Sequence, residues 1–217
     1  MNVGEMNRKT YEFETRIAEL DDILAYYSPI LRGHCRRVGT CTAILAEERA
    51  DDLIYMYDFK NAVELSASVY LGGMCHDIGM LTLPAVGYDR KSYLHHPAAG
   101  VELLKKYSGV IFDGGKPQRM LVNDMAHYHH EQADGNGFPY GVKLSAIPMI
   151  SNLCAIANEI DRILFDKANV KAPYEAVIDF VRENTGILFC GIASECFERT
   201  QNALLEVYVR RVDRITY

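Results

Sequence analysis

The sequence predicts an all-α protein that folds as a single helical bundle of about seven to nine helices. Apolar residues recur at helical spacing in most segments, and the breaks between these segments are short. Strand signals are weak. The length of 217 residues fits one packed domain, because domains usually hold roughly 100 to 200 residues. Residues 1–27 are expected to be a helical extension, followed by the main domain over residues 28–217.

The early helices of the main domain are placed by their start and stop residues. Ser28 and Pro29 suit the cap and the first position of a helix that carries His34 in its early turns. A second helix is predicted over residues 61–77, so that it ends with a His-Asp pair. We expect a loop over residues 81–94, because prolines and glycines interrupt it.

The next helix is expected to begin at Pro97, so that His95 and His96 immediately precede it. A turn at residues 113–117 then leads to a predicted helix over residues 119–131.

The remaining helices follow a tight, glycine-rich loop. One is predicted to start at Pro148 and to place Asn158 and Asp161 together on one face, three residues apart. Two more are predicted between residue 174 and about residue 211, with a break at Gly186.

The composition limits the class of protein. A net charge of −6 argues against binding a nucleic-acid polymer, which needs a surplus of Lys and Arg on one face. The six cysteines have no metal-type spacing and are expected to be reduced core residues. No apolar run reaches the roughly 18 residues of a membrane span, and the start of the chain lacks the apolar core of a leader. We therefore expect a cytoplasmic protein with no membrane partner.

The distribution of histidines is the strongest indication of chemistry. All seven lie in the first 130 residues, several of them in pairs, and histidine is the commonest protein ligand for transition metals. Unrelated surface and core histidines are the alternative, but they have no reason to occur in pairs. The positions are His34, His76, His95, His96, His127, His129 and His130.

The pair His76-Asp77 can supply one nitrogen ligand and one carboxylate that bridges two ions. Mixed imidazole and carboxylate ligands suit Fe or Mn, whereas structural zinc would more often recruit the cysteines. Two ions about 3.5 to 4 Å apart would activate water and hold a phosphodiester for in-line attack. Asp77 is the expected bridge and the expected catalytic residue.

Four motifs follow one another along the chain: His76-Asp77-Ile78-Gly79, His96-Pro97, His129-His130-Glu131 and Asp134-Gly135-Asn136-Gly137-Phe138-Pro139. In this order they resemble the HD-GYP branch of the HD phosphohydrolase superfamily, of which the chain is identified as a divergent member. The likeness covers about residues 28–171.

This resemblance implies an all-helical domain that holds iron or manganese and hydrolyses a cyclic dinucleotide, typically cyclic di-GMP. It implies that one ion is bound by His34, His76, Asp77 and Asn158, and the other by Asp77, His96, His129 and His130. A third ion would use a Glu where this chain has Ile30, so two divalent ions are the expected maximum.

The chain departs from the family pattern at the site itself. Asn158 stands where the family has an Asp ligand, and Met80 stands where it has a phosphate-binding Lys. Phe138 replaces a Tyr. The candidate substrate-binding cations are Lys167, which aligns with a later family cation, Arg37 and Lys143. His95 and His127 match no family ligand and are expected to lie at the surface or behind the ligands.

Three functions therefore compete. The first is a phosphodiesterase acting on a cyclic dinucleotide. The second, suggested by Met80 and Asn158, is a catalytically degenerate module that binds a nucleotide or a signalling protein. The third is an HD-type hydrolase of nucleotide monoesters, which would not explain the glycine loop. The partner hypotheses are a signalling protein at the loop from Asp134 to Pro139 and a homodimer.

Overall fold

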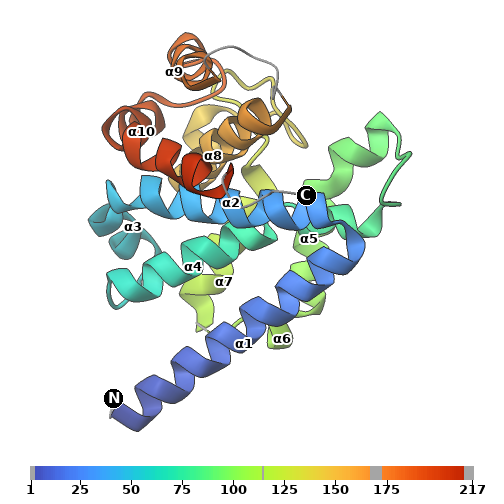
Figure 1. Ribbon diagram of the computed structural model, residues 1–217, viewed down its shortest axis with the longest axis vertical. Coiled ribbons are helices and arrows are strands. Elements are labelled where there is room, and N and C mark those ends of the chain that lie inside the picture. The colour runs from blue at the N-terminus through green and yellow to red at the C-terminus, as the bar shows by residue number, and fades with distance from the viewer. Residues whose placement is uncertain (1–2, 114, 167–172, 213–217) are drawn as a thin grey trace.

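The computed structural model describes the chain except for residues 1–2, 114, 167–172 and 213–217, and in the described residues it is built from helices (Figure 1). No strand occurs among them, only an isolated bridge between Thr185 and Phe189. The predicted all-α class is confirmed. The α-helices are α1 (Val3–Tyr27), α2 (Pro29–Glu47), α3 (Ala50–Tyr57), α4 (Ala62–Cys75), α5 (Arg90–Lys106), α6 (Ser108–Ile111), α7 (Gly115–Tyr128), α8 (Met149–Asp166), α9 (Pro173–Glu183) and α10 (Gly191–Val212). Two 3₁₀ turns, η1 (Ile78–Thr82) and η2 (Leu144–Ala146), complete the order. The described residues form ten α-helices, more than the seven to nine predicted, because α6, of only 4 residues, is too short to be predicted from the apolar pattern.

The predicted starts of α2, which carries His34, and of α4, which leads into His76, are confirmed. At α2, the Ser28 hydroxyl accepts a hydrogen bond from the Leu31 amide at 3.2 Å, and Pro29 occupies the first turn. At α4, Asn61 accepts from the Glu64 amide at 2.9 Å. Each cap satisfies a backbone donor that a helix leaves unpaired at its N-terminus.

The predicted boundaries of α5 and α7 are wrong. Helix α5 begins at Arg90, where Asp89 accepts from the Ser92 amide at 2.7 Å, so His95 and His96 lie within the helix and Pro97 is an interior residue. Helix α7 runs from Gly115 to Tyr128, earlier than predicted at both ends. His129 and His130 therefore follow the last turn of α7.

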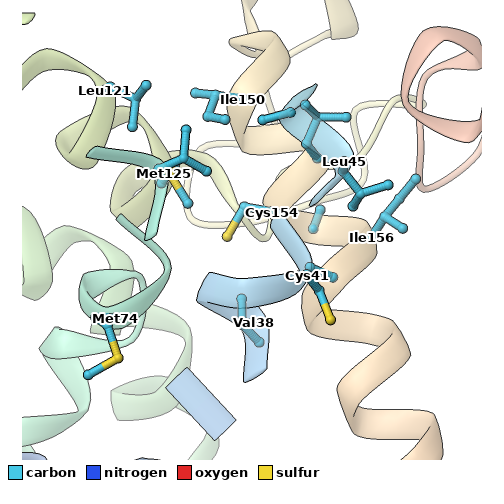
Figure 2. Close-up of a cluster of buried hydrophobic side chains, with 14 of the residues drawn as sticks. Val38, Cys41, Leu45, Met74, Leu121, Met125, Ile150, Cys154 and Ile156 are labelled. Atoms are coloured by element: carbon cyan, nitrogen blue, oxygen red, sulfur yellow. The ribbon is translucent and has the colours of Figure 1, made fainter. Parts of the chain in front are cut away.

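Helix α2 is central to the packing: it contacts α4, α8 and α10, and α4 also packs against α7. Figure 2 shows side chains from these helices meeting in one apolar cluster. They include Val38, Cys41 and Leu45 of α2, Met74 of α4, Leu121 and Met125 of α7, and Ile150, Cys154 and Ile156 of α8. All six cysteines are free and buried, as expected.

Close backbone contacts bring the ligand-bearing segments together. A Cβ atom on Gly79 would overlap the carbonyl oxygen of His96, so glycine is required where η1 meets α5. A Cβ on Gly73 would overlap the backbone of Gly39 in the same way, where α4 crosses α2. These two contacts set the spacing between the helix carrying His34, the end of α4 and the helix carrying His96.

Helix α1 runs along one side of the bundle, and its N-terminal end projects away from it (Figure 1). Its C-terminal half is attached by polar contacts: Arg36 and Arg32 of α2 both donate to the buried Asp21, and the Arg16 guanidinium donates to the Val110 carbonyl at 2.6 Å. The division of the chain at residue 27 stays a prediction. Among the described residues, none of the helices is both long and apolar enough to cross a membrane.

Candidate metal centre

The carboxylate of Asp77, between the end of α4 and η1, lies between two sets of histidines. Its Oδ1 atom is 2.9 Å from Nε2 of His96 and 3.3 Å from Nε2 of His129. Its Oδ2 atom is 3.5 Å from Nε2 of His34 and 3.5 Å from Nε2 of His76. Each oxygen therefore faces a different pair of imidazoles, which is the arrangement that a bridging carboxylate needs.

Within the described part of the chain, the potential ligands form two groups that share Asp77. One group is His34, His76 and Asp77, and the other is Asp77, His96, His129 and His130; in each, the ligand atoms lie within 4.8 Å of one another. We call these the two-histidine half and the three-histidine half. The structure thus brings together all six of the predicted His and Asp ligands, although their role as ligands stays a prediction.

Three of the histidines are oriented by backbone carbonyls. Nδ1 of His76 donates to the Gly73 carbonyl at 2.7 Å, and Nδ1 of His129 donates to the Met125 and Ala126 carbonyls, each at 3.1 Å. Nδ1 of His96 donates to the Tyr93 carbonyl at 2.6 Å. A carbonyl can only accept, so Nδ1 carries the proton and Nε2 presents a lone pair to the site.

The acceptors for these bonds are available because of where each histidine stands in its helix. His76 and His129 follow the last turns of α4 and α7, where backbone carbonyls lack an intrahelical donor. His96 lies inside α5, but Pro97 has no N–H to give to the Tyr93 carbonyl four residues earlier. The interior proline therefore leaves that carbonyl free to bind His96.

His34 is oriented differently, by a carboxylate. Its Nδ1 lies 2.7 Å from Oδ2 of Asp161 on α8, and Asp161 also accepts from Nη2 of Arg37 at 3.0 Å. Arg37 is only 8% exposed, and its guanidinium lies 3.4 Å from the centre of the Phe165 ring. Arg37 borders the cavity at the site, but its charge is already paired with Asp161.

The arrangement is unfavourable without a cation. Nε2 of His34 is 3.2 Å from Nε2 of His76, and Nε2 of His96 is 3.3 Å from Nε2 of His129. When both rings are neutral, His96 and His129 present lone pairs, so these nitrogens repel unless a proton or a metal cation lies between them. Oδ1 of Asp77 is buried and has no hydrogen-bond partner. Lone pairs and an unpartnered carboxylate oxygen converging on one point fit divalent metal ions.

The protonation states agree with this donor set. Burial lowers the pKa of His76 to about 3 and also lowers the pKa values of His129 and His130, which keeps these rings neutral. Burial would raise the pKa of Asp77, but the surrounding histidines hold it well below its usual range. His34 and His96 differ. Burial lowers the pKa of His34, but hydrogen bonds to Asp161 and Asp77 outweigh that effect and raise it to about 9. Burial also lowers the pKa of His96, but its contact with Asp77 outweighs burial and raises the pKa above its ordinary value.

A cavity of about 380 Å³ opens onto Asp77 and His34. Asn158 borders it and is 7% exposed, while aromatic rings of Tyr93, Phe138 and Phe165 form much of its wall. The Phe138 ring stacks on the imidazole of His130, with 4.3 Å between ring centres. Phe138 therefore both lines the cavity and holds the ring of a candidate metal ligand in place.

The other predicted site residues lie elsewhere. Lys143, the residue before η2, is exposed and does not border the cavity, and Lys167 lies outside the described residues. Met80 is 7% exposed and packs into the fold. His95 is exposed, and Nε2 of His127 is 2.6 Å from the Tyr140 hydroxyl, so neither joins the ligand groups.

Some functional contacts were not predicted from the sequence. The buried carboxylate of Glu131 accepts from the Tyr140 amide at 2.8 Å and the Val142 amide at 3.0 Å, and so holds the glycine-rich loop against the end of α7. Arg162 borders the cavity four residues after Asn158. The sequence could have indicated Arg162, because it follows Asn158 by four residues on one predicted helix and so lies on the same face.

Comparison with known proteins decides the family. A family model described as the HD domain matches residues 31–166, which is more than half of the chain. The protein belongs to the HD domain family. The expected family is thereby confirmed, and the matched HD domain includes every residue of the two ligand groups.

Relatives of this HD domain protein include named phosphodiesterases. It is 26% identical to a cyclic di-GMP phosphodiesterase of Thermotoga maritima over 215 residues, which is 94% of this chain and 54% of the relative. It is also 26% identical to 3'3'-cGAMP-specific phosphodiesterase 3 of Vibrio cholerae over 186 residues, 82% of this chain and 36% of the relative. The HD domain protein thus spans about half the length of the first relative and about a third of the second.

Proposed function

We propose that the protein is a metal-dependent phosphodiesterase that hydrolyses a cyclic dinucleotide, with cyclic di-GMP as the first substrate to test. The observation that carries the proposal is the placement of Asp77, whose two oxygens face two separate histidine pairs. The names of the two relatives, both cyclic dinucleotide phosphodiesterases, support the choice of substrate class.

The residues divide the work between holding metal and orienting ligands. His96, His129 and His130 would hold one ion, His34, His76 and Asn158 the other, and Asp77 would bridge them. Two divalent ions, Fe or Mn in our proposal, supply Lewis acidity and lower the pKa of a water molecule toward neutrality. Asp161 fixes the direction of His34, and the aromatic wall of the cavity gives a nucleobase a surface for stacking.

The test is reconstitution with Fe(II) or Mn(II) without oxygen, followed by measurement of metal content and of cyclic di-GMP and 3'3'-cGAMP hydrolysis. Asp77→Asn should remove both ions and lower turnover by more than about 100-fold, because loss of a supporting contact alone costs 10- to 100-fold. Asp51→Asn on the exposed surface of α3 is the matched control and should change neither. Unchanged turnover in Asp77→Asn would refute the proposal.

A catalytically degenerate binding module is the second candidate, and two observations favour it. Asn158 offers an amide where a carboxylate would hold a cation better, and the buried Met80 adds no charge to the cavity. If this candidate is right, reconstituted protein will bind cyclic di-GMP in calorimetry without producing linear dinucleotide. A signalling partner at the loop from Asp134 to Pro139, a homodimer and a cytoplasmic location stay predictions.

A further inference from the structure

Among the described residues that border the cavity beside the candidate metal centre, α8 supplies an exposed guanidinium group that an anionic ligand could reach. Two guanidinium groups border the cavity, those of Arg37 and Arg162. Arg37 is buried, paired with Asp161 and packed on a ring. The side chain of Arg162 is 61% exposed. A phosphate that enters the cavity can therefore reach Arg162 without breaking a buried ion pair.

Arg162 is held by a contact that can exchange. Its Nε atom donates to Oε2 of Glu159 at 3.0 Å, and its Nη2 atom donates to the same oxygen. The Arg162 side chain is 61% exposed and the Glu159 side chain 18% exposed, so water competes mainly for the guanidinium, and ion pairs open to solvent contribute little to stability. Phosphate accepts two parallel hydrogen bonds from a guanidinium, a geometry that one carboxylate oxygen does not match. An incoming phosphate can thus replace Glu159.

The position of Arg162 on α8 relates it to the metal centre. It follows Asn158 by four residues, and such residues lie on the same face of a helix. Asn158, Asp77 and Arg162 all border the same cavity. Helix α8 therefore places the Arg162 guanidinium at the cavity, beside the two-histidine half, where it can neutralise the negative charge of a bound phosphodiester.

We propose that Arg162 binds a phosphate group of the substrate and that Glu159 competes with the phosphate for its guanidinium. This inference rests on the proposed function for the identity of the substrate. Arg162→Ala should raise KM for cyclic di-GMP on the order of tenfold, as expected for loss of a charge-assisted hydrogen bond, with kcat within about twofold. Glu159→Gln should lower KM, because an amide holds the guanidinium less strongly.

The experiment compares turnover by the manganese-loaded enzyme with calorimetric binding of cyclic di-GMP. Arg162→Lys should restore part of the affinity by keeping the charge without the planar fork. Arg199→Ala is the matched control, because Arg199 is 66% exposed, lies on α10 and pairs with Glu48, and it does not border the cavity. Increasing salt should weaken binding less in Arg162→Ala than in the unmodified protein, because the screened charge is gone.

The outcomes separate this inference from the proposed function. If the unmodified protein turns over substrate and Arg162→Ala behaves like Arg199→Ala, the role of Arg162 is refuted and the proposed function stands. If the protein binds cyclic di-GMP without turnover and Arg162→Ala weakens binding, the catalytic proposal fails and the phosphate contact is supported. If the unmodified protein neither binds nor hydrolyses cyclic di-GMP, both are refuted.

Discussion

The two halves of the candidate metal centre share Asp77 but differ in how firmly their potential ligands are held. The three-histidine half has His96 and His129 buried at 1% and 2% exposure, and each is fixed by a neutral carbonyl. The two-histidine half contains His34, which is partly exposed and fixed by a carboxylate, and the further ligand that we propose for it is the amide of Asn158. Ligand affinity follows ligand charge and rigidity, so the three-histidine half should fill first.

The comparison shows that the partner of the second ring nitrogen matters as much as the ligand itself. A carbonyl acceptor places no charge behind the imidazole, and His76 and His129, which have such acceptors, have lowered pKa values and stay neutral. The carboxylate of Asp161 fixes His34 equally well but stabilises its proton, so the metal-free ring is cationic at neutral pH. An ion entering the two-histidine half must first displace that proton.

The largest expected difference between the halves comes from removing one histidine of each. His129→Ala should abolish tight binding in the three-histidine half and lower turnover by more than about 100-fold. His34→Ala should lower metal content from about two ions per chain to about one, because the three-histidine half keeps its ligands. Metal content after gel filtration checks both. Equal loss of metal in the two variants would show that the halves are not independent.

A smaller effect is expected when the carboxylate behind His34 is changed. Asp161→Asn should weaken binding in the two-histidine half by about 10- to 100-fold through His34. It should also destabilise the fold by about 3–5 kcal/mol, because it leaves the buried Arg37 charge without its partner.

Asp21→Asn is the matched control for this variant. Asp21 is a buried carboxylate with two arginine partners, and it lies outside the two ligand groups. Its loss should lower the melting temperature without changing metal affinity, measured by titration with Mn(II). If both variants weaken metal binding alike, Asp161 acts through stability and not through His34.

A carboxylate at position 158 should reduce the difference between the halves. Asn158→Asp is expected to tighten binding of the second ion by about tenfold, since ligand charge is a main determinant of cation affinity. Asn123→Asp, which makes the same change on α7 outside the ligand groups, serves as the control. Isothermal titration of the half-loaded protein measures the second site alone. A second affinity that does not change would mean that residue 158 does not ligate metal.

The two halves should also differ in how their metal affinity depends on pH. The pKa of about 9 at His34 means that affinity in the two-histidine half falls as pH falls below 9, by up to about tenfold per unit. In the three-histidine half, burial lowers the pKa values of His129 and His130, and only His96 has a raised pKa, so metal affinity there should depend less on pH. The protonated His34 also stabilises the metal-free fold below its usual pKa of 6.5, and this contribution disappears as pH rises through about 9. Calorimetry in buffers of different ionisation enthalpy counts the protons released, and none released by the second ion at pH 7 would contradict this account.

The sequence predicted which residues form the centre better than it predicted how they are held. Three of the four motifs contain five of the six candidate ligands, because metal chemistry restricts the residue types that can serve. The acceptors behind them are backbone carbonyls of Gly73, Tyr93 and Met125, and any residue supplies a carbonyl, so no residue type marks them. The pairing of Arg37 with Asp161 joins residues 124 positions apart and depends on how α2 packs on α8.

The wrong helix boundaries have a common cause. Pro97 was interpreted as a helix start because proline favours the first turn, whereas the cap at Asp89 stands a full two turns earlier. Helix α7 starts at Gly115, a residue with weak helix propensity that the sequence placed in a turn. In both places the packing of α5 and α7 against their neighbours outweighs the local preference of one residue.

Pro97 allows His96 to be oriented by a backbone carbonyl, and α5 loses one of its own hydrogen bonds as a result. In a regular helix the Tyr93 carbonyl would be consumed by the amide four residues later, and His96 would have to find another acceptor or turn freely. Regularity of α5 and alignment of His96 therefore compete for the same oxygen atom. Any change that repairs the helix at this point withdraws the support of one metal ligand, although no atom of the proline itself faces the ions.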